Sequence, residues 1–157
     1  MMKTSFSITE TDKGFTKLIK GLKNLSPVTL KAGLFGDGSS DPKTNVALRG
    51  YINEHGSEAR GIPSRPFLQQ TNQVKGESWN DEFIKMYNNN LEVKESGLVN
   101  ILNKMVFDIK NQIVNGSYKE NAPSTIAKKG SDKPLIDTGE MLNSITGKIE
   151  YGKGKDE

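Results

Sequence analysis

The apolar side chains between residues 95 and 115 constrain the fold more than any other feature of the chain. They recur at the i, i+3, i+4 spacing that lines them up along one face of a helix. The set comprises Leu98, Ile101, Leu102, Met105, Ile109 and Ile113. An amphipathic helix buries such a face against another element of the fold. The segment therefore predicts a long central helix.

Two other stretches show helical spacing. The first begins at Thr11 or Asp12, either of which suits an N-cap, and carries lysines on its polar face. Its apolar residues are Phe15, Leu18, Ile19, Leu22 and Leu25. The second follows the proline at position 66 and is expected to end near residue 88, where the NNN run at 88–90 breaks it. Its apolar residues are Leu68, Trp79, Phe83, Met86 and Tyr87. These patterns predict an N-terminal amphipathic helix and a second long central helix.

A shorter helix is expected over residues 45–55. Asn45 suits its N-cap, and Gly56 suits a left-handed stop at its carboxyl end. The histidine at the end of this helix, His55, is the only one in the chain. We interpret it as a structural helix-end residue, because an imidazolium is favoured at a helix carboxyl terminus.

The segment PLIDTGEM, residues 134–141, has the features of a helix start. Asp137 can accept from the amides of a first turn, and Glu140 can reach back to form a capping box. Ile136 and Met141 stand at the two positions of a hydrophobic staple. A capped helix beginning at this point is therefore expected.

Strands are predicted where apolar and polar residues alternate. The alternation runs from Val28 to Leu34 and again from Ile145 to Tyr151, with a shorter candidate at residues 5–9. We expect an α+β fold, in which a small antiparallel sheet packs with the N-terminal amphipathic helix and the two longer central helices. Residues 1–157 are expected to form a single domain, with mobile loops at 36–45 and 115–134 and a frayed tail at 152–157.

Composition excludes several classes of function. The chain has no cysteine, so disulfides, thiolate metal sites and thiol nucleophiles are excluded. One histidine with scattered acids does not supply a metal site, and no nucleophile or phosphate-binding motif accompanies it. No apolar run suits a signal peptide or a membrane span, so synthesis in the cytosol is expected. We predict no catalytic, metal or cofactor site and no enzymatic activity.

The segment RGIPSRPFLQQT, residues 60–71, has two interpretations. It is either a hydrophobic anchor at the entrance of a helix or a surface that contacts another subunit. The three arginines of the chain, at positions 49, 60 and 65, lie in or near it, and arginine is enriched at protein interfaces. The candidate interface residues are Ile62, Pro63, Arg65, Pro66, Phe67 and Leu68.

Two longer segments carry a resemblance to a known family. YINEHGSEARGIPSRPFLQQT and KPLIDTGEMLNSITGKI resemble the two signatures of small tail-completion and neck proteins of tailed bacteriophages, in the same order. His55 stands where the family usually has phenylalanine. The residues that carry the match outside the interface set are Glu54, His55, Gly56, Pro134, Leu135, Asp137, Thr138, Gly139, Ser144 and Ile145.

The resemblance implies a structural virion protein of α+β fold that is assembled in the host cytoplasm. Such a subunit forms a ring, with six-fold symmetry favoured and twelve-fold symmetry possible, at the head-proximal end of the tail. Its partners would be tail-terminator, tail-tube or head-connector proteins, and phage DNA would pass through the lumen without sequence specificity. In such a ring Phe67 would be a hydrophobic plug and Arg65 a paired charge at a subunit contact.

A different class of function stays open on charge. The net charge of +3 and the isoelectric point near 9.0 are mildly basic. The lysines of the N-terminal helix could follow a phosphate backbone, with a solvated helix face as the simpler interpretation. They are Lys13, Lys17, Lys20 and Lys23. The alternative function is therefore a small basic nucleic-acid-binding module.

Overall fold

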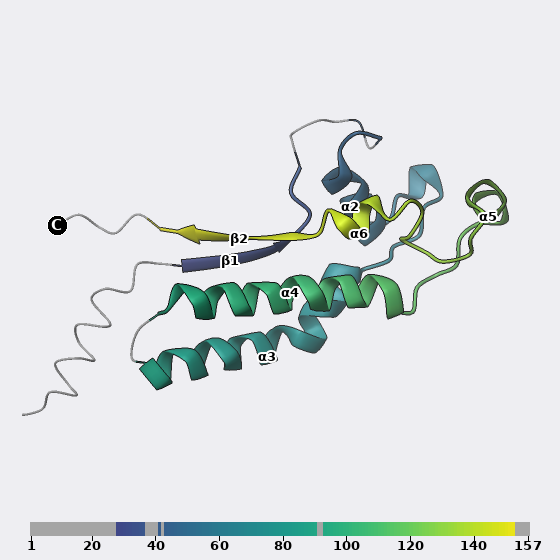
Figure 1. Ribbon diagram of the computed structural model, residues 1–157. Helices are drawn as coiled ribbons and strands as arrows, with labels where there is room; N and C mark the ends of the chain where they lie inside the picture. Colours follow the sequence, from purple (N-terminus) through teal and green to yellow (C-terminus); the bar gives the residue numbers. More distant parts are fainter. Residues whose placement is uncertain (1–27, 37–40, 42, 91–92, 153–157) are drawn as a thin grey trace, which may run out of the picture.

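The computed structural model describes residues 28–36, 41, 43–90 and 93–152. Several predictions lie outside these residues: the strand at 5–9, the N-terminal helix with its four candidate DNA-facing lysines, half of the loop at 36–45 and nearly all of the tail at 152–157. In the part of the chain that is described, helices and a two-stranded antiparallel sheet form an α+β fold (Figure 1).

The sheet joins the first and last described elements. Strand β1 (Val28–Gly33) pairs antiparallel with β2 (Thr146–Tyr151), with Val28 opposite Tyr151 and Gly33 opposite Thr146. Along both strands exposed polar residues alternate with half-buried residues, as expected for a sheet with one face on the core. Both strands were predicted by that alternation, and the sheet confirms the prediction.

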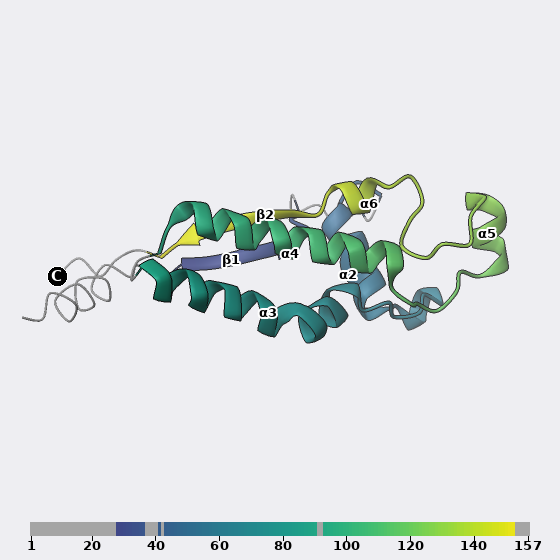
Figure 2. The same ribbon diagram turned by 60° about the horizontal axis from the view of Figure 1, so that its bottom comes forward.

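Two long helices lie on one side of the sheet. Helix α4 (Glu95–Asn115) packs against both strands and also against α3 (Phe67–Asn90), so α4 is the middle layer (Figures 1 and 2). The indole nitrogen of Trp79 on α3 donates to the carboxylate of Asp108 on α4 at 2.8 Å. The predicted bounds of α4 are confirmed. Helix α3 continues through the NNN run, since the helix preference of asparagine is only a few tenths of a kcal/mol below that of average residues.

The short helical elements lie together at the end of the molecule where α4 ends (Figure 1). They are α2 (Val46–His55), the 3₁₀ turn η1 (Glu58–Arg60), α5 (Pro123–Lys129) and α6 (Glu140–Asn143). The Asn45 side chain accepts from the amide of Leu48 at 3.0 Å, which confirms the predicted cap of α2. The buried core cluster at this end draws on three helices and the residue just before β2, and contains Phe67, Ile109, Ile113, Met141 and Ile145.

Two predictions for this end are wrong. The connection at 115–134 contains α5, which begins with Pro123 and ends at Gly130 in the left-handed conformation, two standard helix boundary signals. The capping box at Asp137 does not form either. Helix α6 starts only at Glu140, whose amide lies 3.4 Å from the Thr138 hydroxyl oxygen. Gly139, with φ 80°, turns the chain between Asp137 and the helix, so the Asp137 side chain does not reach the first turn.

Candidate functional site: the groove between the two motif segments

The first motif segment folds back on itself just after α2. The Arg65 amide donates to the Asn53 carbonyl at 2.7 Å, and the Ser64 hydroxyl donates to the Glu54 carbonyl at 2.7 Å. Gly56 permits this contact: its φ is +77°, and an added Cβ would lie 2.7 Å from the Ser64 nitrogen. The ψ angle of Gly56 is 179°, which is extended and not left-handed. The predicted left-handed stop at Gly56 is therefore wrong. The segment is thus a closed loop tied to the end of α2.

The Glu54 side chain caps the first turn of α3. It is buried, with 8% of its surface exposed. Its two carboxylate oxygens accept from the amides of Leu68 and Gln69 at 2.9 and 2.8 Å. Those amides lie in the first turn of α3, where backbone donors have no partner within the helix. A side chain from α2 therefore provides the cap that the sequence next to α3 lacks.

Arg65 is bound within its own chain. Its guanidinium donates to the carbonyls of Lys119 and Glu120 at 2.9 and 3.0 Å, and to the Asn121 side chain at 3.1 Å. Burial leaves Arg65 6% exposed and lowers its pKa. The predicted role of Arg65 as a paired charge between subunits is therefore wrong. Its planar fork instead fastens the start of the 115–134 connection to the first motif segment.

Phe67 is the first residue of α3 and belongs to the core. It is 0% exposed, which excludes the predicted role as a plug for another subunit. The other interpretation of this segment, a hydrophobic anchor at a helix entrance, describes Phe67 correctly. The remaining candidate interface residues are half-buried, and they are Ile62, Pro63, Pro66 and Leu68.

The second motif segment crosses the same end of the molecule. Leu135 has φ 62°, and it is the non-glycine residue with positive φ in the described part of the chain. Asp137 and Thr138 are exposed. Ser144 donates its amide to the Glu140 carbonyl at 2.9 Å and ends α6. Ile145 is buried and leads into β2.

A groove of about 540 Å³ separates the two motif segments. One wall contains Ile62 and Pro63 from the first segment, and the opposite wall runs along residues 135–141 of the second. Arg49, Arg60 and Arg65 all line it. The three arginines that cluster in the sequence thus line one surface of the folded chain. That surface is concave and lies where the two motif segments meet.

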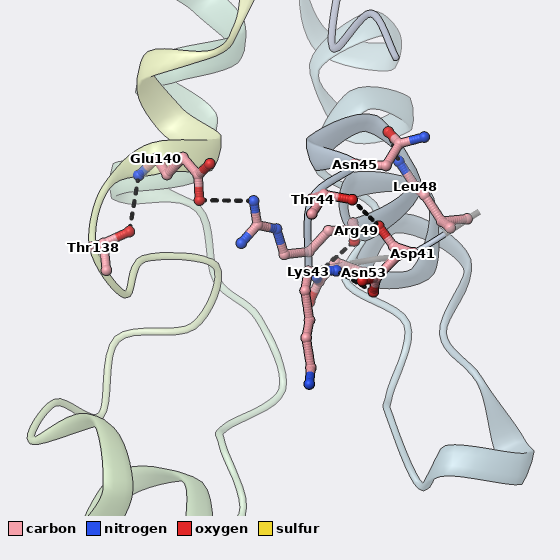
Figure 3. A network of polar contacts seen from close by, with 9 residues as sticks. All are labelled: Asp41, Lys43, Thr44, Asn45, Leu48, Arg49, Asn53, Thr138 and Glu140. Atoms are coloured by element: carbon pink, nitrogen blue, oxygen red, sulfur yellow. Dashed lines mark hydrogen bonds and ion pairs between the residues drawn. The ribbon is translucent and has the colours of Figure 1, made fainter. Parts of the chain in front are cut away.

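An ion pair joins the groove walls. The Nη2 atom of Arg49 on α2 lies 2.8 Å from the carboxylate of Glu140 on α6 (Figure 3). The Asn53 side chain donates to the Arg49 carbonyl at 2.9 Å (Figure 3). The pair is half-exposed, so its contribution to stability is small. Its main effect is to hold α6 beside α2, because it connects residues that stand 91 positions apart.

His55 lies at the end of α2, as predicted. Its ring stacks near that of Tyr51, with centroids 4.3 Å apart, and its Nδ1 atom lies 3.1 Å from the Tyr51 carbonyl. Among the described residues, no three acidic or histidine side chains come together as a metal site requires. In the same residues, no helix has the length and apolarity needed to cross a bilayer.

Comparison of the chain with models of protein families, with curated proteins and with solved structures finds no match.

Sequence reasoning missed three features of this groove. The pairing of Arg49 with Glu140 has no local sequence signal, since it depends on how α2 and α6 meet. The contact of Arg65 with residues 119–121 is equally non-local. Helix α5, which contributes Ser124 and Lys129 to the lining, does have a signal in the Pro123 and Gly130 that bound it.

Proposed function

We propose that this chain is a structural virion protein that forms a ring at the head-proximal end of a phage tail and helps to join the tail to the head connector. The observation that carries the proposal is the meeting of the two motif segments. They are far apart in sequence, yet they form the two walls of one groove. Residues that resemble one family in two separate places thus belong to one structural unit.

The solvent-exposed side of α4 is consistent with a subunit that has neighbours. Three large apolar residues on it are exposed: Val99, Phe107 and Val114. Their spacings of eight and seven residues bring them onto one side of the helix. Exposed apolar residues that gather on one face often mark a protein contact. A ring neighbour would cover this face of α4.

Particle mass tests the proposal directly. Native mass spectrometry would be applied to the purified full-length chain, alone and after mixing with tail tubes or head connectors, with negative-stain images of both samples. We expect closed rings or stoichiometric capping of the tail ends, and the mass would give the copy number. A persistent monomer that binds neither tails nor connectors would refute the proposal. Salt-sensitive DNA binding by that monomer would favour the nucleic-acid-binding module instead.

A further inference from the structure

We propose that the groove between the motif segments binds an extended acidic peptide segment of a neighbouring protein, with Arg49 and Arg60 as the side chains that hold its carboxylates. The inference rests on the proposed assembly function for the origin of that segment, which would belong to an adjacent subunit or layer. The chemistry of the groove itself is independent of that origin.

Charge selects an anionic occupant. The groove is lined by four cationic side chains, from Arg49, Arg60, Arg65 and Lys129, and by the two carboxylates of Asp137 and Glu140. The formal charge of the lining is therefore +2. Arg65 gives its donors to carbonyl and amide oxygens of its own chain, and the Lys129 ammonium donates to the Lys133 carbonyl. These acceptors are neutral and leave both positive charges in place, so Arg65 and Lys129 add to the field that favours an anion, while Arg49 and Arg60 offer guanidinium donors for direct contact.

The side chains of Arg49 and Arg60 have N–H donors that the described part of the chain leaves without an acceptor. The Arg60 side chain is exposed, and no hydrogen bond or ion pair of it to the described residues is found. Arg49 gives one hydrogen bond to Glu140, and its Nε atom is buried with no partner in the described part of the chain. A guanidinium has five N–H donors and pairs best with a carboxylate through two parallel bonds. Because the Nε atom is buried, an incoming carboxylate would bind Arg49 through the Nη donors that Glu140 leaves unused.

The apolar part of the lining favours a peptide over a nucleic acid. Ile62, Pro63 and Leu135 are half-buried in the groove beside the arginines. A phosphate backbone is bound by surface cations and gains nothing from such aliphatic contacts. A peptide offers both carboxylates and apolar side chains, and a groove of this volume is large enough to take a few residues in extended form.

The backbone at Leu135 holds one wall in place. A left-handed conformation is unfavourable for a non-glycine residue, and such residues persist where the surrounding structure fixes them. Here Leu135 also packs against the core cluster. The wall is therefore formed before a ligand arrives, which lowers the entropic cost of binding.

Fluorescence anisotropy with a labelled peptide of alternating glutamate and alanine tests the proposal. Its control is the same peptide with glutamine in place of glutamate. For the full chain we expect binding of the glutamate peptide and an affinity for the glutamine peptide lower by about tenfold or more. Arg60→Gln should weaken binding of the glutamate peptide by about tenfold. Lys85→Gln, which removes the same charge from the exposed side of α3, should leave the affinity nearly unchanged. Circular dichroism checks that both variants are folded.

Three outcomes would overturn the proposal: equal affinity for the two peptides, equal losses in Arg60→Gln and Lys85→Gln, or preference of the groove for a single-stranded oligonucleotide that Arg60→Gln abolishes. Ring formation and tail capping by the same samples are measured separately. Rings without peptide binding would refute the groove assignment alone, and peptide binding without rings or capping would refute the assembly function alone.

Discussion

The carboxylate of Glu54 caps α3 by accepting a hydrogen bond from the amide of Leu68 at 2.9 Å. The two residues belong to different helices, so the end of α2 and the start of α3 form one unit. The loop between them, residues 56–66, is thereby fixed in place, and it supplies the first wall of the groove.

Replacing Glu54 should therefore destabilise the whole end of the molecule. Glu54→Ala removes both acceptors from the first turn of α3, and we expect the free energy of unfolding to fall by about 1–3 kcal/mol. Urea denaturation followed by the fluorescence of Trp79 measures this change. Glu58→Ala, at an exposed position nearby, is the matched control. Equal losses in the two variants would show that the cap contributes nothing.

The two phenylalanines Phe67 and Phe107 give a matched test of core against surface. Phe67 is 0% exposed and Phe107 is 66% exposed. Phe67→Ala should lower the free energy of unfolding by about 3–5 kcal/mol, and Phe107→Ala should change it by about 0.5 kcal/mol or less. If the solvent-exposed side of α4 meets a neighbour, Phe107→Ala should still weaken ring formation in native mass spectrometry. Normal rings from that variant would exclude Phe107 from the subunit contact.

Gly56 and Gly130 separate steric contact from backbone strain. Both have positive φ, but an added Cβ meets the backbone of Ser64 and Ile62 at Gly56 and nothing within 4 Å at Gly130. Gly130→Ala should cost about 1–2 kcal/mol through its conformation alone. Gly56→Ala should cost clearly more, because two backbone atoms must move. Thermal unfolding of both variants makes the comparison, and similar losses would contradict the tight contact of the first motif loop.

Arg65→Lys should loosen the connection after α4. A lysine keeps the charge but cannot reach three acceptors in one plane, so we expect a loss of about 1–3 kcal/mol in the free energy of unfolding. Hydrogen exchange should become faster at residues 117–122, which the guanidinium now holds. Arg60→Lys is the control, since the Arg60 side chain is exposed. Unchanged exchange in Arg65→Lys would mean that the connection is held by other contacts.

Ionisation of Tyr118 should make the free energy of unfolding depend on pH in the alkaline range. Burial raises the pKa of Tyr118 above its ordinary value of 10.0. The neutral phenol, which donates to the Gln112 carbonyl at 2.8 Å, therefore stabilises the fold fully below that value, and the contribution is lost as the pH rises through the folded pKa. Tyr118→Phe should be less stable than the natural chain by about 1 kcal/mol at pH 8. The gap should narrow above pH 10. A gap that stays constant across this range would contradict the assignment.

Periodicity predicted the elements whose packing is regular. The spacing from Leu98 to Ile113 gave the bounds of α4, and the alternation from Val28 gave β1, because one face of each element packs against the rest of the fold while the other face meets solvent. The same reasoning failed at Asp137, where a capping pattern is present but Gly139 turns the chain before the helix begins.

The groove was harder to predict, because its contacts join distant residues. The chemistry of Arg65 indicated that it binds something, and a planar fork suits backbone carbonyls as well as a partner's carboxylate. The sequence does not distinguish these two kinds of acceptor, since residues 119–121, which Arg65 contacts in its own chain, show no complementary charge pattern. Phe67 posed the same ambiguity, which is resolved only by knowing that Ile109 and Ile113 lie over it.

The pairing of Val28 with Tyr151 has a consequence for how the chain is made. The sheet cannot close until the last strand has left the ribosome, so α3 and α4 are complete before the layer that covers α4 exists. Synthesis of a chain that stops before residue 146 would leave β1 without its partner and the buried face of α4 open to water. Such fragments would be substrates for proteolysis, so the topology favours the survival of copies that contain β2.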